Sequence, residues 1–397
     1  MNREEARTVN GEERREVTAG RAGHTISFEL PAKMEFGPGR IGILERVVEE
    51  NDFERVAFVM SPGRRRSGMF DPVIARLGNR GMDVFVFDRV EANPTLASVG
   101  DCIRALRGFG PHAIVGIGGG SALDTAKAAA ACVANRTENP VDLLDEECTK
   151  KRAIPTILVP TTAGTGSEVN YWAVITDEEK REKLSIGTPK MAPFMAVVDP
   201  SLALSLPPDV TLWTGLDALT HAVEAFISTS GNWLSDMFCL GAASLITESL
   251  EWAVGHGDDL AARGNLALAS LLAGAAMENV GLGLVHAMSH QVSGFYDTPH
   301  GRTNAILLPH VLAFNEPACE AKISTLDGLV KEAGTVRIWL ERLMRLHGER
   351  DEAIRIRSAD VPVMSERAAS NVNARTNPRR ATEEEIAAIY RDAFEVA

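Results

Sequence analysis

The stretch HAIVGIGGGSALDTAK (112–127) decides the fold. Its apolar start predicts a buried strand (112–118), its glycines predict a tight loop, and its Ala-rich end predicts a helix. Glycine has no Cβ, so the loop backbone approaches an anion closely, and the free N–H groups of the helix N-terminus bind a phosphate. The expected phosphate-binding residues are Gly118, Gly119, Gly120 and Ser121. The spacing differs from the ordinary dinucleotide fingerprint and from a P-loop, and a strand–helix turn without a ligand gives the same pattern.

Apolar runs on either side of this stretch extend the unit into a sheet. Further strands are predicted at 55–60, 83–88 and 154–160, with helices at 40–54, 67–80 and 93–107. Strands and helices that alternate at this spacing predict a doubly wound, Rossmann-like parallel sheet. The segment TISFELPAKMEFGPG (25–39) begins the folded unit with a strand, a proline break and a turn, after a charged, flexible tail at 1–23. We therefore predict a dinucleotide-binding α/β domain at 24–205.

The pattern changes after about residue 205, where strand-like runs end. Long Ala/Leu-rich stretches predict helices at 214–228, 234–254, 259–280 and 283–295. Prolines cluster in DPSLALSLPP (199–208), which marks the boundary. The remainder, 206–397, is predicted to be an all-α domain that carries the metal and the catalytic residues.

A second loop, PTTAGTGSEV (160–169), follows the fourth predicted strand. Its small hydroxyl side chains offer hydrogen-bond donors without bulk, although an ordinary polar loop has the same composition. The candidates for cofactor contact are Thr161, Thr162 and Thr165. Ligands of open α/β sheets bind beyond the carboxyl ends of the strands, so two such loops favour a cofactor crevice at that edge.

Five side chains suited to a metal ion fall in three segments: GLDALTHAVEAF (215–226), LVHAMSHQV (284–292) and TPHGRTNA (298–305). They are Asp217, His221, His286, His290 and His300. Two of the segments carry an i,i+4 pair, which projects from one face of a helix. Imidazole and carboxylate suit a divalent transition metal, and three histidines with one aspartate leave a position open for substrate. Five candidates compete for four places, and spacing alone does not say which one is excluded.

The composition narrows the class of protein. The chain has 397 residues, 45% of them hydrophobic, and a net charge of −13, which argues against a nucleic-acid partner. Its five cysteines form no CxxC pair, as is typical of reduced thiols in the cytoplasm. No purely apolar run reaches the roughly 18 residues of a membrane span, and the charged N-terminus argues against a signal peptide.

Together these motifs resemble the iron-containing (group III) alcohol dehydrogenases, which are related to glycerol dehydrogenase and dehydroquinate synthase. The matching segments are FGPGRI (36–41), VEANPT (90–95), GGGSALDTAK (118–127), PTTAGTGSEV, AVIT (173–176), VVDPSL (197–202), TGLDALTHAVE (214–224), HAMSHQV (286–292), TPHGRTNAILLPH (298–310) and TNPRRATEEEIAAIY (376–390). The resemblance covers about 28–320 and returns at 373–392, and it implies a dehydroquinate synthase-like fold. The segment 320–372 is a weaker match.

The resemblance assigns roles to individual residues. It implies a metal ion, Fe²⁺ or alternatively Zn²⁺, held by Asp217, His221, His286 and His300. It places His290 near the nicotinamide and substrate instead, where we hypothesise that it relays a proton. It places the pyrophosphate over Gly119, Gly120 and Ser121, and it brings Asn93, Lys183 and the threonines of the second loop to the cofactor.

Three positions depart from the family pattern. Ser61 stands in VMSPGRRRSG (59–68) where NAD-using relatives often carry an acid, and the arginines that follow it bind phosphate well. This favours NADPH over NADH, unless the arginines only solvate a surface turn. Trp172 is expected to face and narrow the substrate pocket. Arg302 follows His300 closely and is expected either to meet an anionic substrate group or to point outward.

We therefore expect a metal-dependent, NAD(P)H-linked alcohol dehydrogenase or aldehyde reductase for a small primary alcohol or aldehyde. An anionic aldehyde such as phosphonoacetaldehyde or a semialdehyde is included in that range. The alternatives are a dehydroquinate-synthase-like or glycerol-dehydrogenase-like enzyme on the same fold, and a non-catalytic binding protein. The family implies a homodimer that acts on a small-molecule alcohol or aldehyde. The cysteines indicate the cytoplasm, and the charge and the apolar run lengths argue against nucleic acid and membrane.

Overall fold

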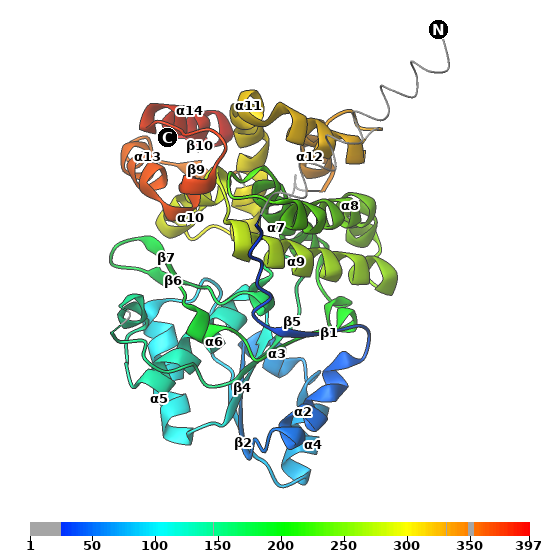
Figure 1. Ribbon diagram of the computed structural model, residues 1–397, viewed down its shortest axis with the longest axis vertical. Helices are drawn as coiled ribbons and strands as arrows, with labels where there is room; N and C mark the ends of the chain where they lie inside the picture. The colour runs from blue at the N-terminus through cyan, green and yellow to red at the C-terminus, as the bar shows by residue number, and fades with distance from the viewer. Residues whose placement is uncertain (1–24, 146, 331, 348–352) are drawn as a thin grey trace.

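The computed structural model describes residues 25–145, 147–330, 332–347 and 353–397. The predicted tail at 1–23 lies outside these residues. A parallel sheet forms the N-terminal part, and a group of helices forms the C-terminal part (Figure 1). The predicted fold class, a doubly wound α/β domain followed by a helical domain, is confirmed.

The sheet has six parallel strands in the order β1-β8-β5-β4-β2-β3. Their bounds are β1 Lys33–Phe36, β2 Arg55–Met60, β3 Asp83–Phe87, β4 Ala113–Gly118, β5 Thr156–Pro160 and β8 Met195–Val198. Strands β4 and β5 are buried along their whole length. Such strands have helices on both faces, which explains their near-continuous apolar sequence.

Side chains that alternate along β2 pack against helices on opposite faces of the sheet. Val56 and Phe58 join the core cluster that includes α2 (Leu44–Glu50) and α4 (Asp71–Asn79). Ala57 and Val59 join the cluster on the other face, with α5 Leu96–Phe109 and α6 Gly120–Asn135. The period of two in a strand produces this division.

Some element boundaries differ from the predictions. The expected helix at 40–54 is a 3-10 turn (Arg40–Ile43) followed by the shorter α2. The expected helix at 67–80 is the shorter α4, and the sequence did not predict the short α3 (Pro62–Arg66) before it. The sequence did not predict β8, nor the antiparallel hairpin of β6 (Ala173–Asp177) and β7 (Glu182–Ile186). In Figure 1 this hairpin extends from the sheet domain toward α10.

The carboxylate of Asp199 ties the domain boundary to the start of the sheet. It accepts hydrogen bonds from the backbone N–H groups of Gly39 and Ile41, both at 3.0 Å, and of Ser201 at 3.1 Å. The segments FGPGRI and VVDPSL therefore meet in one turn structure, because β1 pairs with β8.

The helical part contains eight helices among the described residues. They are α7 Pro208–Ile227, α8 Trp233–Gly255, α9 Leu260–Val280, α10 Leu284–Tyr296, α11 His300–Asp327, α12 Val336–His347, α13 Val361–Ser370 and α14 Glu383–Ala393. One short parallel pair, β9 (Arg355–Ile356) with β10 (Glu395–Val396), interrupts the predicted all-α pattern. Contrary to the expectation from the sequence, α8 and α9 have the length and hydropathy of a membrane span. Both contribute to one core cluster with α7, and buried helices of a folded domain have this composition.

Candidate active site

Four of the predicted metal ligands meet where three helices approach one another. Asp217 and His221 project from α7, His286 from α10, and His300 from the first turn of α11. The ligand atoms of Asp217, His221 and His286 all lie within 4.8 Å of one another. Nε2 of His300 lies 3.8 Å from Asp217 Oδ1, and Nε2 of His221 lies 4.0 Å from the same oxygen. Ligand atoms on one tetrahedral ion are about 3.4 Å apart, so the distances to Asp217 Oδ1 are slightly wider than a bound cation would impose.

Hydrogen bonds fix which ring nitrogen of each imidazole faces this point. Nδ1 of His286 donates to Glu224 Oε2 at 2.6 Å, and Nδ1 of His221 donates to the carbonyl of Gly164 at 3.1 Å. In both rings Nε2 therefore keeps its lone pair for a cation. The donor set fits a divalent transition metal.

Burial keeps the imidazoles of His286 and His300 neutral, as metal binding requires. It lowers the pKa of His286 to about 3, with a further lowering from the neighbouring His221. It also holds the pKa of His300 well below its usual range. Burial raises the pKa of Glu224 to about 7, against the backbone hydrogen bonds from Val285, Gly283 and His286 that lower it.

The structure separates the two histidines that spacing left open. His300 has its Nε2 close to Asp217. His290 is buried beside the group, with its ring centre 6.1 Å from that of His286 and 5.4 Å from that of His300. The arrangement favours His300 as the fourth ligand and leaves His290 for another role, as the family resemblance implies. The roles themselves stay predictions.

The two glycine-containing loops pack directly against each other at the carboxyl ends of β4 and β5. A Cβ on Gly120 would lie 2.8 Å from Thr165, and a Cβ on Gly119 would lie 3.3 Å from the hydroxyl of Thr162. Only glycine allows this approach, which places Ser121 and the N-terminus of α6 beside the threonines. The hydroxyl oxygen of Thr161 is buried without a hydrogen-bond partner among the described residues. The second loop also carries Gly164, so it joins the predicted cofactor site to the metal ligand His221.

Two protein-family models together match nearly the whole chain. Residues 31–200 match the iron-containing alcohol dehydrogenases, and residues 211–394 match the C-terminal part of the Fe-containing alcohol dehydrogenase family. The chain belongs to the iron-containing alcohol dehydrogenase family.

Individual relatives agree with this assignment. Alcohol dehydrogenase 4 of Saccharomyces cerevisiae (strain YJM789) is 36% identical over 377 residues, which cover 93% of this chain and 98% of the relative. The crystal structure of a 1,3-propanediol oxidoreductase is 34% identical, with a TM-score of 0.83 and coverage of 94% of this chain and 100% of that chain. The sulfoacetaldehyde reductase of Bifidobacterium kashiwanohense, solved in complex with NAD⁺, is 26% identical with a TM-score of 0.81, covering 94% and 99%.

In this member of the iron-containing alcohol dehydrogenase family, Asn93 and Lys183 form one network. Asn93 accepts a hydrogen bond from Lys183 Nζ at 2.9 Å and donates to Asp297 Oδ1 at 2.7 Å. The network joins the loop before α5, strand β7 and the end of α10, so it links the sheet domain to the helix that carries His286 and His290. Burial lowers the pKa of Lys183 to about 8.

Ser61 lies at the carboxyl end of β2, next to β4 in the sheet. Its hydroxyl caps the short α3 by accepting from Arg64 N at 3.3 Å. Arg65 pairs with Asp71, and burial lowers the pKa of Arg64. The position suits contact with the adenosine end of a dinucleotide, but these contacts do not distinguish NADPH from NADH.

The two predicted substrate-pocket residues lie at different places. The ring of Trp172 packs on Gly187 near the end of β7, where a Cβ would come within 2.5 Å of it. The guanidinium of Arg302 lies 5.9 Å from the ring centre of Trp213, which is one turn before Asp217 on α7. Arg302 is therefore near the metal ligands, whereas Trp172 contacts the hairpin. Whether either side chain faces the substrate stays a prediction.

Sequence reasoning missed three buried polar residues around the metal ligands: Glu224, Asn304 and Asn377. Asn377 Oδ1 accepts from Leu284 N at 3.2 Å at the start of α10, which explains why TNPRR belongs to the family pattern. Glu224 lies three residues after His221 on the same helix, and this spacing was the one available signal.

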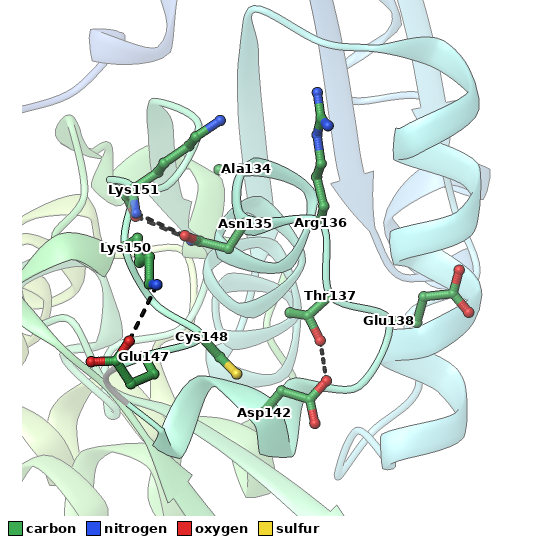
Figure 2. Close-up of a pocket in the computed structure, with 10 residues that line it drawn as sticks. All are labelled: Ala134, Asn135, Arg136, Thr137, Glu138, Asp142, Glu147, Cys148, Lys150 and Lys151. Atoms are coloured by element: carbon green, nitrogen blue, oxygen red, sulfur yellow. Dashed lines mark hydrogen bonds and ion pairs between the residues drawn. The ribbon is translucent and has the colours of Figure 1, made fainter.

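A surface pocket of about 640 Å³ lies beyond the C-terminal end of α6 (Figure 2). It contains none of the predicted site residues. Lys150 pairs with Glu147 at 3.2 Å, and the side chains of Arg136, Glu138 and Asp142 point in different directions. We assign it no part in the family chemistry.

Proposed function

We propose that this chain interconverts small primary alcohols and aldehydes by hydride transfer with a nicotinamide cofactor. Asp217, His221, His286 and His300 would hold the cation, which we propose to be Fe²⁺, with Zn²⁺ as the alternative. When bound, the cation would supply Lewis-acid polarisation of the substrate oxygen, and the nicotinamide would supply or accept the hydride. The observation that carries the proposal is the convergence of Asp217, His221 and His286, with His300 beside Asp217 and with the tautomers of His221 and His286 fixed by Gly164 and Glu224.

The chain's own residues would orient the reactants. The glycines after β4 and the N-terminus of α6 would hold the pyrophosphate, and Thr162 and Thr165 would fix its position. Lys183, held by Asn93, would contact the cofactor near the junction of the two domains. We propose that His290, buried beside the ligands, moves the proton of the alcohol. A His290→Ala variant that kept full activity across the pH range would remove that role.

For the cofactor we propose NADPH in preference to NADH, because Ser61 lacks the charge that repels a 2′-phosphate and three arginines follow it. The relative solved with NAD⁺ supports NADH as the alternative. Values of kcat/KM for both cofactors decide between them, and a tenfold preference for NADH would contradict our choice.

The substrate class we favour is a short uncharged alcohol or diol, as the name of the propanediol oxidoreductase suggests. A second candidate, a small anionic aldehyde, rests on Arg302 near the metal ligands and on the likeness to sulfoacetaldehyde reductase. Both substrate classes can be tested with a panel of neutral and anionic aldehydes. Each aldehyde is assayed with NADH and with NADPH, after the protein is reloaded with Fe²⁺ or Zn²⁺. Failure of every aldehyde to oxidise NAD(P)H would contradict the proposal and favour a lyase or a binding protein.

We also propose a homodimer in the cytoplasm that works without nucleic acid or membrane. The five cysteines, which are all free thiols, support the cytoplasm, and the net charge of −13 argues against nucleic acid; the dimer rests on the family alone. Light scattering of the purified chain measures its oligomeric state directly.

A further inference from the structure

Asn304 contacts three of the four proposed ligands. It lies on α11, one turn after His300, and its exposed fraction is 0%. Its amide nitrogen lies 2.8 Å from Asp217 Oδ1, 3.2 Å from His286 Nε2 and 3.1 Å from His300 Nε2. The three partners belong to three different helices, so one amide group touches side chains from α7, α10 and α11.

The orientation of this amide follows from its neighbours. An amide has an N–H donor end and a carbonyl acceptor end, and exchanging the two would place the carbonyl oxygen against the Asp217 carboxylate. Two acceptors at 2.8 Å repel, so the nitrogen faces Asp217. Nδ1 of His286 already donates to Glu224, so His286 Nε2 is also an acceptor facing the amide.

Of the three contacts of the Asn304 amide, only the hydrogen bond to Asp217 is compatible with a bound cation. A carboxylate oxygen has two lone pairs and can accept a hydrogen bond while it binds a cation, whereas a neutral imidazole nitrogen has only one lone pair. The amide nitrogen has two hydrogens for three acceptors. When a cation is bound, the hydrogen bond that the Asn304 amide keeps is therefore the one to Asp217. The two nearby imidazoles place the amide at the edge of the ligand group.

The other end of Asn304 argues against a purely structural role. Its Oδ1 is buried without a hydrogen-bond partner among the described residues. An unpaired buried acceptor destabilises a fold, and an apolar side chain of the same size avoids that cost. A leucine here would fill the same space and remove this unpaired oxygen, but it would also remove the hydrogen-bond donor of the buried Asp217 carboxylate.

We propose that Asn304 is a positioning residue for the metal centre. Its amide donates to Asp217 and so fixes which carboxylate oxygen faces the three imidazoles. This inference rests on the proposed metal centre and adds a residue that is not itself a ligand. Without the hydrogen bond the carboxylate can rotate away, which weakens metal binding and changes the geometry around the ion.

Co²⁺ titration of the EDTA-treated protein tests the proposal, with visible absorption as a readout of geometry and a chelator competition as a readout of affinity. The variants are Asn304→Leu, which keeps the volume, and Asn304→Ala. The matched control is Thr303→Val, because Thr303 is also fully buried on α11 and its hydroxyl bonds to Thr298 and Pro299 and to no ligand. Circular dichroism and thermal unfolding in EDTA check the fold of each variant.

We expect the two Asn304 variants to lose about 10- to 100-fold in Co²⁺ affinity, with shifted absorption bands. We expect both Asn304 variants to remain folded in EDTA, as circular dichroism would show. Thr303→Val should keep the wild-type affinity and spectrum. Three results would overturn the inference. The Asn304 variants could bind Co²⁺ within twofold of the wild-type affinity with unchanged absorption bands, Thr303→Val could lose as much affinity as they do, or both Asn304 variants could unfold in EDTA. If the wild type itself binds no Co²⁺, the proposed metal centre fails instead.

Discussion

Glu224 is the side chain whose effect on the metal centre follows most directly from the structure. Its buried carboxylate accepts from Val285 N and from His286 Nδ1, both at 2.6 Å, and so holds both the N-terminus of α10 and the ring of His286. Glu224→Gln keeps the shape but places an NH₂ group against one of these two donors. The variant therefore loses one charge-assisted hydrogen bond, worth about 1.5–3 kcal/mol, or roughly 10- to 100-fold in metal affinity.

The assay is a chelator competition for Co²⁺ or Zn²⁺ on Glu224→Gln and on a control, Glu278→Gln. Glu278 lies on α9 beside Tyr171, and burial raises its pKa to about 7 as it does that of Glu224. We expect the control to bind metal as the wild type does and Glu224→Gln to bind it at least tenfold more weakly. Equal affinities in the two variants would refute the idea that Glu224 orients His286.

Three further predictions concern the sheet domain and its junction with the helices. Lys127→Met should raise the cofactor KM about tenfold, because its buried Nζ bonds to backbone carbonyls of the second loop, and steady-state kinetics measures this. Burial raises the pKa of Glu168 to about 7, so the folded state binds its proton more tightly and stability falls as the pH rises from about 4.5 through 7. Glu168→Gln should flatten that fall, as thermal unfolding in EDTA at pH 5 and pH 7.5 would show, and an unchanged slope counts against it. Asn93→Ala separates Lys183 from Asp297 and should raise the cofactor KM with little change in Co²⁺ affinity; a parallel loss of Co²⁺ binding would contradict this.

The sequence predicted the central strands well because each is a short, uniformly apolar run between helices. Strand β8 has only four residues. In the hairpin, β6 alternates buried with half-buried positions and β7 is mostly half-buried, so neither β8 nor the hairpin has a uniformly apolar run. The interior strand β8 and the separate β6–β7 hairpin were therefore missed, while strands β2, β3, β4 and β5 were found.

Spacing identified the candidate metal ligands but left the choice between His290 and His300 open. Both i,i+4 pairs present equivalent geometry on their own helices. The choice depends on how α11 meets α7, which follows from the turn after α10, where Asp297 has a left-handed φ of 52°. Glu224 and Asn304 were missed for a related reason, because a polar residue on a helix suggests a solvated face until tertiary packing buries it.

The most direct test of the metal centre compares Co²⁺ binding by His300→Ala and His290→Ala. A four-ligand site contributes about 10–16 kcal/mol, so loss of one ligand should cost roughly 100-fold or more in affinity. We expect His300→Ala to show that loss and His290→Ala to bind one equivalent with nearly the wild-type affinity. The reverse result, with His290→Ala losing the ion and His300→Ala keeping it, would contradict the proposed ligand set.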